Sequence, residues 1–260
     1  MKVLFIGDVF GAPGVRAVQK RLSGLVAQHG VDLVVCNAEN AAGGFGVTRD
    51  LARELFAAGC DVLTGGNHTF DKREALELLD DDERVLRPHN YPAENPGSGM
   101  AVVDVDGWTV AVLNLQGRIF MPPTDCPFGA ADRLIEAVGD EADVILVDLH
   151  AEATSEKIAM AWHLDGRVAA LVGTHTHVQT ADEQVFPQGM AYITDLGMTG
   201  PHESVIGIQV DQSLGRFLNS RPIRFQAATR GVRLHGALVT IEPDAGRATA
   251  IERIRVDLDS

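Results

Sequence analysis

Short apolar runs alternate with segments of helical period along the first third of the chain. The runs are aliphatic or β-branched, which predicts three strands, at 3–6, 33–36 and 62–64. Between them, 15–26 is predicted as a helix entered through Pro13, and 48–58 as a helix capped by Thr48. This alternation is typical of βαβ units and of a largely parallel sheet.

The middle of the chain changes to an antiparallel pattern. The runs 100–105 and 108–115 flank Asp106-Gly107, which favours a hairpin with a type I′ turn. Four later segments are predicted as strands, at 144–147, 168–172, 234–241 and 248–256, the last two as an antiparallel pair. A helix is expected at 155–163. The order predicts an α/β sandwich of two mixed sheets.

Composition indicates one globular domain covering 1–260. The 260 residues are 45% hydrophobic and 22% charged, and no repeat or Pro- or Ser-rich linker divides them. The three cysteines, Cys36, Cys60 and Cys126, form no C-x-x-C pair, so neither a disulfide framework nor a thiolate zinc site is indicated. The first apolar run is too short for a signal peptide, and no run is long enough to span a membrane, so a cytoplasmic location is expected.

Charge narrows the class of ligand. The net charge of −14 would repel the phosphate backbone of duplex nucleic acid, which argues against a partner bound through basic patches. Small phosphates stay compatible with this charge, because bound divalent cations can present a positive centre to an anionic substrate.

Polar clusters follow the predicted strands at the points where the strands end. Ligand-type residues occupy these positions: Asp8, Glu39, Asn40, Asn67, His68, His150, His175 and His177. In open α/β sheets the ligand site lies beyond the carboxyl ends of the strands, so these residues are expected to converge.

Each cluster alone also has a structural interpretation. Asp8 could cap a turn, Glu39 and Asn40 could satisfy loop backbone, and His150 could be a packed core histidine. The pair His175-x-His177 places two imidazoles on one side of an extended segment, which suits two adjacent metals. Together the clusters favour a metal site with mixed nitrogen and oxygen ligands. The other five histidines are interpreted as surface or packing residues: His29, His89, His163, His202 and His235.

These blocks resemble a known family. The GNH, lone His and G-x-H-x-H elements are similar to those of the calcineurin-like metallophosphoesterases. More closely, the chain resembles the bacterial YmdB-like branch, through GDVFG (7–11), NAENAAGG (37–44), TGGNHTFD (64–71), DLHAEATSEK (148–157) and GTHTHVQT (173–180). That branch contains phosphodiesterases acting on cyclic nucleotides. The resemblance implies a four-layer α/β/β/α sandwich.

The resemblance also implies a division of the ligands between two metals. Asp8, Glu39, Asn40 and His177 would hold one, and Asn67, His150 and His175 the other, with Glu39 bridging. Two cations about 3.5–4 Å apart can share a hydroxide that attacks the phosphoryl group. His68 directly follows an expected ligand and is the expected general acid. General acid catalysis typically raises the reaction rate about 10²–10⁴-fold.

The chain departs from the superfamily pattern in two places, both matching the YmdB-like variation. The usual D-x-H opening is Asp8-Val9-Phe10, and Glu39 replaces the bridging aspartate. Phe10 cannot coordinate a metal, so Asn40 is the available replacement donor. Mixed imidazole and carboxylate ligands suit iron, manganese or zinc better than calcium or magnesium, and the resemblance favours iron or manganese.

Four further residues are candidates for substrate binding. Gly43 and Gly44 could bring backbone N–H groups to a phosphate or could simply form a tight turn. Phe45 could cover a nucleobase or pack on its own scaffold. Arg118 could steady a phosphate or lie on the surface.

Other functions remain as alternatives. The glycines 7, 11 and 14 lack the G-x-G-x-x-G spacing of dinucleotide-binding proteins, which makes an oxidoreductase a weak option. A phosphomonoesterase or protein phosphatase would use the same metal pair, and a metal-dependent regulatory or scaffold protein of low turnover would share the fold. A homo-oligomer is compatible with each.

Overall fold

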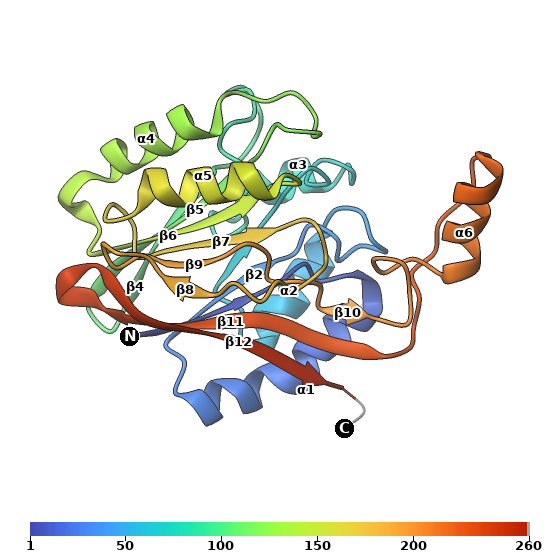
Figure 1. The fold of residues 1–260 in the computed structure, drawn as a ribbon, viewed down its shortest axis with the longest axis horizontal. Helices are drawn as coiled ribbons and strands as arrows, with labels where there is room; N and C mark the ends of the chain where they lie inside the picture. Colours follow the sequence, from blue (N-terminus) through green and yellow to red (C-terminus); the bar gives the residue numbers. More distant parts are fainter. Residues whose placement is uncertain (259–260) are drawn as a thin grey trace.

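The computed structural model describes residues 1–258 and has the four expected layers (Figure 1). One sheet has the order β10-β11-β1-β2-β3, with β12 paired to β11, and the other has the order β4-β5-β6-β7-β9-β8. The first sheet comprises β1 (Lys2–Ile6), β2 (Leu33–Asn37), β3 (Val62–Thr64), β10 (Gly200–Pro201), β11 (Val232–Glu242) and β12 (Arg247–Asp257). The second comprises β4 (Met100–Val105), β5 (Trp108–Gln116), β6 (Val144–His150), β7 (Ala170–Thr174), β8 (Gln184–Val185) and β9 (Ala191–Ile193).

Helices cover the outer faces of both sheets, and one further helix projects from the body of the molecule. They are α1 (Gly11–His29), α2 (Arg49–Ala58), α3 (Ala75–Asp81), α4 (Pro127–Val138), α5 (Thr154–Leu164) and α6 (Val210–Asn219), and short 3-10 turns lie at Gly139–Glu141 and Pro243–Ala245. Figure 1 shows α1 and α2 against the first sheet, α4 and α5 against the second, and α6 projecting from the body of the molecule. None of the helices within residues 1–258 is long and apolar enough to cross a membrane.

Three apolar layers hold the sandwich together. The central layer joins the two sheets, with Val3 and Phe5 of β1 facing Val144 and Leu146 of β6. The outer layers seat α1 and α2 on the first sheet, and α4 and α5 on the second. Alternate residues of a strand point to opposite faces, so both faces of β1 and β6 are apolar. This explains why their sequences are nearly continuous aliphatic runs.

The structure confirms the fold class and corrects several boundaries. The turn at 106–107 has positive φ at both residues, 52° and 87°, as a type I′ turn requires. The first helix begins at Gly11 rather than at 15, and it ends where the left-handed Gly30 returns its N–H to Val26 O. β7 covers Ala170–Thr174 rather than 168–172, because Leu146 to His150 of β6 pair in register with these five residues.

A buried ion pair ties α5 to the end of β7. The Lys157 side chain is fully buried, and its Nζ donates to Asp195 Oδ2 and to Thr174 O, both at 2.8 Å. Asp195 in turn accepts the backbone N–H of Thr176 at 3.1 Å and of Gly197 at 2.9 Å. Each charge is therefore paired and further hydrogen-bonded, which is the condition for a buried pair to persist. The pair fixes the loop that carries the two loop histidines.

We predict that Lys157→Met strongly destabilises the fold. The substitution leaves Asp195 buried without its counter-charge, which should lower the free energy of unfolding by about 3–5 kcal/mol. Chemical denaturation measures the change. The control is Arg230→Met, because Arg230 pairs with Glu203 at 3.2 Å with both side chains largely exposed, and such pairs contribute less than about 1 kcal/mol. Equal losses in the two variants would contradict the role assigned to the buried pair.

Candidate metal centre

The seven residues predicted as ligands lie at one edge of the sandwich. Asp8 follows β1, Glu39 and Asn40 follow β2, Asn67 follows β3, His150 ends β6, and His175 and His177 follow β7. These strands run parallel within each sheet, so their carboxyl ends share an edge. The two sheets meet there, and the loops of both contribute to one cluster.

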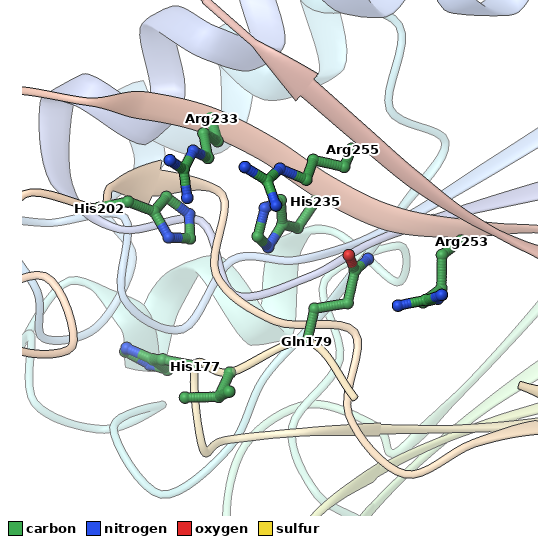
Figure 2. A pocket seen from close by; sticks show the side chains of 8 residues that line it. His177, Gln179, His202, Arg233, His235, Arg253 and Arg255 are labelled. Atoms are coloured by element: carbon green, nitrogen blue, oxygen red, sulfur yellow. The ribbon is translucent and has the colours of Figure 1, made fainter. Parts of the chain in front are cut away.

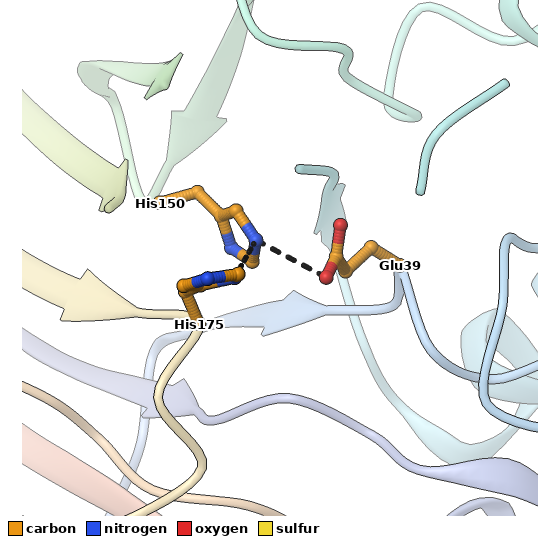
Figure 3. A group of neighbouring side chains, drawn as sticks. All are labelled: Glu39, His150 and His175. Atoms are coloured by element: carbon orange, nitrogen blue, oxygen red, sulfur yellow. Dashed lines mark hydrogen bonds and ion pairs between the residues drawn. The ribbon is translucent and has the colours of Figure 1, made fainter. Parts of the chain in front are cut away.

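One group of donor atoms surrounds Nε2 of His150. Glu39 Oε1 lies 3.1 Å from this nitrogen, and Asn67 Oδ1 and His175 Nδ1 each lie 3.0 Å from it. Figure 3 shows the side chains of Glu39, His150 and His175 pointing toward one another from three different elements. Ligands that bind one transition metal at about 2.0–2.2 Å stand roughly 3.0–3.6 Å apart. The spacing therefore fits a shared cation.

A second group lies around His177. Its Nε2 is 3.3 Å from Asn40 Oδ1 and 3.8 Å from Asp8 Oδ1. Asp8 Oδ1 is also 3.9 Å from Nδ1 of His150, so this carboxylate stands between the two groups. Asp8 is fully buried and its Oδ1 has no hydrogen-bond partner in the described chain, whereas its Oδ2 accepts the backbone N–H of His175 at 3.2 Å. An unsatisfied buried carboxylate oxygen is costly, and a cation would satisfy it.

The three imidazoles are oriented by oxygen atoms behind them. Thr174 Oγ1 donates to Asp148 Oδ1 at 2.7 Å and so accepts from Nδ1 of His150 at 3.0 Å. The carbonyl of Ile206 lies 2.9 Å from Nδ1 of His177. Glu152 Oε2 lies 3.1 Å from Nε2 of His175. Holding the outer N–H in this way leaves the inner nitrogen's lone pair for a metal.

Charges within the cluster are strongly coupled. Burial raises the pKa of Asp8 to about 6, although His177 and His150 oppose the shift. Glu39 and His150 shift in the opposite sense to the effect of their burial. Burial would raise the pKa of Glu39, but the charge of His150 lowers it to about 2. Burial would lower the pKa of His150, but the charges of Glu39 and Asp8 raise it to about 9. Without a cation, a proton on His150 balances the carboxylates. A bound cation would take over this role.

Gly66 provides the space between the side chains of Glu39 and His150. A Cβ at this position would lie 2.3 Å from Glu39 Oε2 and 2.5 Å from Nε2 of His150. These distances are far inside van der Waals contact, so a side chain at residue 66 and the present ligand arrangement exclude each other. The tight approach of the GNH loop depends on this glycine.

His68 lies beside the cluster rather than within it. Its backbone N–H donates to Glu39 Oε2 at 2.9 Å, and its Nδ1 lies 2.7 Å from Asp71 Oδ2. The ring of Phe45 meets the imidazole edge-on, with centroids 5.0 Å apart. The side chain is 27% exposed, so Nε2 is the ring nitrogen that a substrate could reach.

The residues predicted to bind substrate make fewer contacts with the cluster than His68 does. Gly43 is exposed, whereas Gly44 is buried where a Cβ would contact the Phe10 ring at 2.7 Å. Phe10 itself packs edge-on against His177, with centroids 5.6 Å apart. Arg118 is exposed, and its backbone N–H donates to the carboxylate of Glu156.

Sequence reasoning missed the residues that support the proposed ligands and His68. They are Asp71, Asp148, Glu152 and Thr174, all hydrogen-bonded or ion-paired to a histidine of the site or to its partner. Asp148 could have been found, because an acid inside the apolar run of β6 has to be paired. It also accepts from Thr64 Oγ1 and from Asn37 Nδ2.

The sequence of the chain matches a known protein family. A family model described as "YmdB-like protein" matches residues 4–254. The chain belongs to the YmdB-like family. A 2′,3′-cyclic-nucleotide 2′-phosphodiesterase of Bacillus subtilis is 44% identical over 259 residues, covering 100% of this chain and 98% of that protein.

Two solved structures of similar sequence share the fold. A protein from Thermus thermophilus is 46% identical with a TM-score of 0.94, and 99% of each chain is covered. A structure described as a novel phosphatase from Mycoplasma pneumoniae is 34% identical with a TM-score of 0.94, covering 99% of this chain and 93% of the other. These similarities indicate that this YmdB-like chain is a phosphoric ester hydrolase.

We predict that Thr174→Val weakens metal binding while the chain still folds. The substitution removes the hydroxyl that orients the His150 ring, and loss of such a support typically lowers metal affinity about 10–100-fold. Competition with a chelator measures the affinity. The control is Thr176→Val, since the Thr176 side chain makes no hydrogen bond within residues 1–258. Unchanged affinity in Thr174→Val would refute the orienting role.

Proposed function

We propose that this YmdB-like chain hydrolyses 2′,3′-cyclic nucleotides by breaking the bond between phosphorus and the 2′ oxygen, with 3′,5′-cyclic nucleotides as a secondary substrate. The relative from Bacillus subtilis, which carries this activity in its name, supports the substrate. The single observation that carries the proposal is the inward convergence of the ligand atoms around His150 and His177, including the unpartnered Asp8 Oδ1.

The ligands proposed for two cations fall into the two groups described above. Asn67, His150 and His175 would hold one cation and Asp8, Asn40 and His177 the other, with Glu39 between them. Imidazole nitrogens beside carboxylates suit iron or manganese, and zinc fits as well. Bound cations would supply charge for the phosphoryl oxygens and lower the pKa of an attacking water.

His68 is proposed as the proton donor. Water adds to phosphorus and releases a proton to solvent, the bond to the 2′ oxygen breaks, and His68 Nε2 gives its proton to the departing alkoxide. Solvent then reprotonates His68. The product is a nucleoside 3′-phosphate. Asp71 and the backbone contact to Glu39 hold the imidazole beside the cluster without using Nε2, which the transfer requires. Phe45 packs against the same ring and restricts its motion.

We predict that His68→Ala lowers turnover of a 2′,3′-cyclic nucleotide about 10²–10⁴-fold, because the leaving alkoxide must then depart without its proton donor. Metal content should be unchanged, since His68 is placed outside the ligand set. Turnover and metal content are measured on the same preparation. His29→Ala is the matched control, because His29 lies at the far end of α1.

An aryl phosphodiester makes the test specific for proton donation. A phenolate leaves without protonation, so His68→Ala should lose much less activity on this substrate than on the cyclic nucleotide. Equal losses on both substrates would show that His68 acts in some other way. Loss of metal in the variant would show that it is a ligand.

The alternatives lead to different results in the same assay. A phosphomonoesterase would favour aryl monoesters over the cyclic nucleotides. A regulatory or scaffold protein would keep its cellular effect in His68→Ala, whose turnover is removed. Neither alternative has a favouring observation comparable to the similarity to the Bacillus subtilis phosphodiesterase.

A further inference from the structure

A basic cavity opens beside the metal centre, on the side formed by β11 and β12. Its volume is about 500 Å³, within the range of small-ligand sites. Six of its eight lining residues are arginine or histidine: His177, His202, Arg233, His235, Arg253 and Arg255. Among the described residues no carboxylate lines it, although acidic residues outnumber basic ones 36 to 22 in the chain. Figure 2 shows Arg233 and Arg255 above His202 and His235, and Arg253 to the right of Gln179.

The strand register explains how the cavity arises. Val239 pairs with Ile251, and both face the core between the sheets. The same face continues with Ala237 opposite Arg253 and His235 opposite Arg255, because alternate residues of paired strands share a face. An inward face that is apolar along most of the hairpin thus becomes basic at one end. A closed sandwich would need apolar residues there.

His235 lies at the base of the cavity with unused hydrogen-bonding capacity. It is only 5% exposed, and neither ring nitrogen has a hydrogen-bond partner in the described chain. The centroid of its ring lies 4.4 Å from the centroid of the His202 ring. Burial lowers the pKa of His235 to about 3, and His202 and Arg255 add to the shift. Buried polar groups are normally paired, so this ring indicates a missing ligand.

The arginines also retain free donors. Arg233 reaches Asp257 through Nε at 2.8 Å, and Arg253 reaches Glu183 through Nε at 2.8 Å, which leaves their terminal amino groups available. The side chain of Arg255 makes no hydrogen bond or ion pair with any residue in 1–258. Guanidinium groups match the oxygens of phosphate in pairs, so three of them around one cavity favour a phosphate group over a single-point anion.

The cavity adjoins the metal centre through the backbone. Gly7, which precedes the ligand Asp8, donates its N–H to His235 O at 3.0 Å. Thr199 links Asp8 to His235. Its N–H donates to Asp8 O at 2.9 Å, and its Oγ1 bonds to the backbone of His235 at 3.1 Å. His177 belongs to both sites. The cavity is thus next to the metal centre and shares His177 with it, while its three arginines, His202 and His235 lie outside the proposed ligand set.

From this geometry we propose that the β11–β12 cavity binds a phosphate group, either as the free anion or as a small phosphate ester, separately from the metal centre. The binding does not depend on the proposed hydrolysis. Arg255, Arg253 and Arg233 supply the donors and His235 the buried contact.

The experiment is calorimetric titration of the metal-loaded chain with inorganic phosphate at low ionic strength, where screening is weak. Arg255→Gln should remove one binding event per chain or weaken it about tenfold or more, since a hydrogen bond to a charged group contributes that much. Arg253→Gln should weaken the same event and covers a failure of the first variant to fold. The control is Arg230→Gln, two residues before β11 and outside the cavity, which should match the unsubstituted chain.

A second titration with a nucleoside 3′-monophosphate identifies the source of the phosphate. If the arginine variants bind both ligands more weakly, the site accepts phosphate esters. If only the binding of inorganic phosphate is weakened, the site takes the free anion. Metal content is measured in each variant, so that damage to the metal centre is recognised. Identical titrations for the unsubstituted chain and for both arginine variants, with metal retained, would overturn the proposal. That result would leave the proposed hydrolysis untouched, since turnover is measured independently.

Discussion

The constraint on which the rest of the structure depends is the direction of the imidazole nitrogens at the meeting edge of the two sheets. Each of the three histidines has an oxygen atom behind its outer nitrogen, so each inner nitrogen faces other acceptors at about hydrogen-bond distance. Acceptors facing acceptors repel unless a proton or a cation lies between them. The protein therefore concentrates electrostatic strain at a single point, and the surrounding fold has to be stable enough to maintain it.

Buried polar contacts around the site add to the apolar layers in holding these side chains in place. Asp148 lies within the apolar strand β6 and joins Asn37, Thr64 and Thr174, which come from both sheets. The Lys157 and Asp195 pair fixes the loop after β7 in the same way. These contacts connect the two sheets at their edge, where the apolar layer between them gives way to the polar site.

The sequence allowed the fold class and the convergence of the site residues to be predicted for a simple reason. Parallel strands place their carboxyl ends together, so Asp8, Glu39 and Asn67 are expected side by side without any knowledge of loop structure. The backbone requirement at Asp106-Gly107 is equally local.

The strands β8, β9 and β10 were missed because two or three residues carry no detectable period. The acceptor for His177 is the backbone carbonyl of Ile206, for which side-chain identity gives no signal. The basic cavity was missed because Arg253 and Arg255 have the alternation of an exposed strand face, and only the pairing of β12 with β11 brings them beside His235 at one cavity.

Gly66 has a consequence for how members of such a lineage could change. Most ligand substitutions would leave a partial site, whereas a single added methyl group at residue 66 would fill the room between Glu39 and His150 and leave the rest of the sandwich in place. A descendant that kept the fold but gave up chemistry could do so by that one replacement. A homologue that retains all of these side chains yet carries alanine or serine at this point of the loop should therefore lack the arrangement of Glu39 and His150 described here.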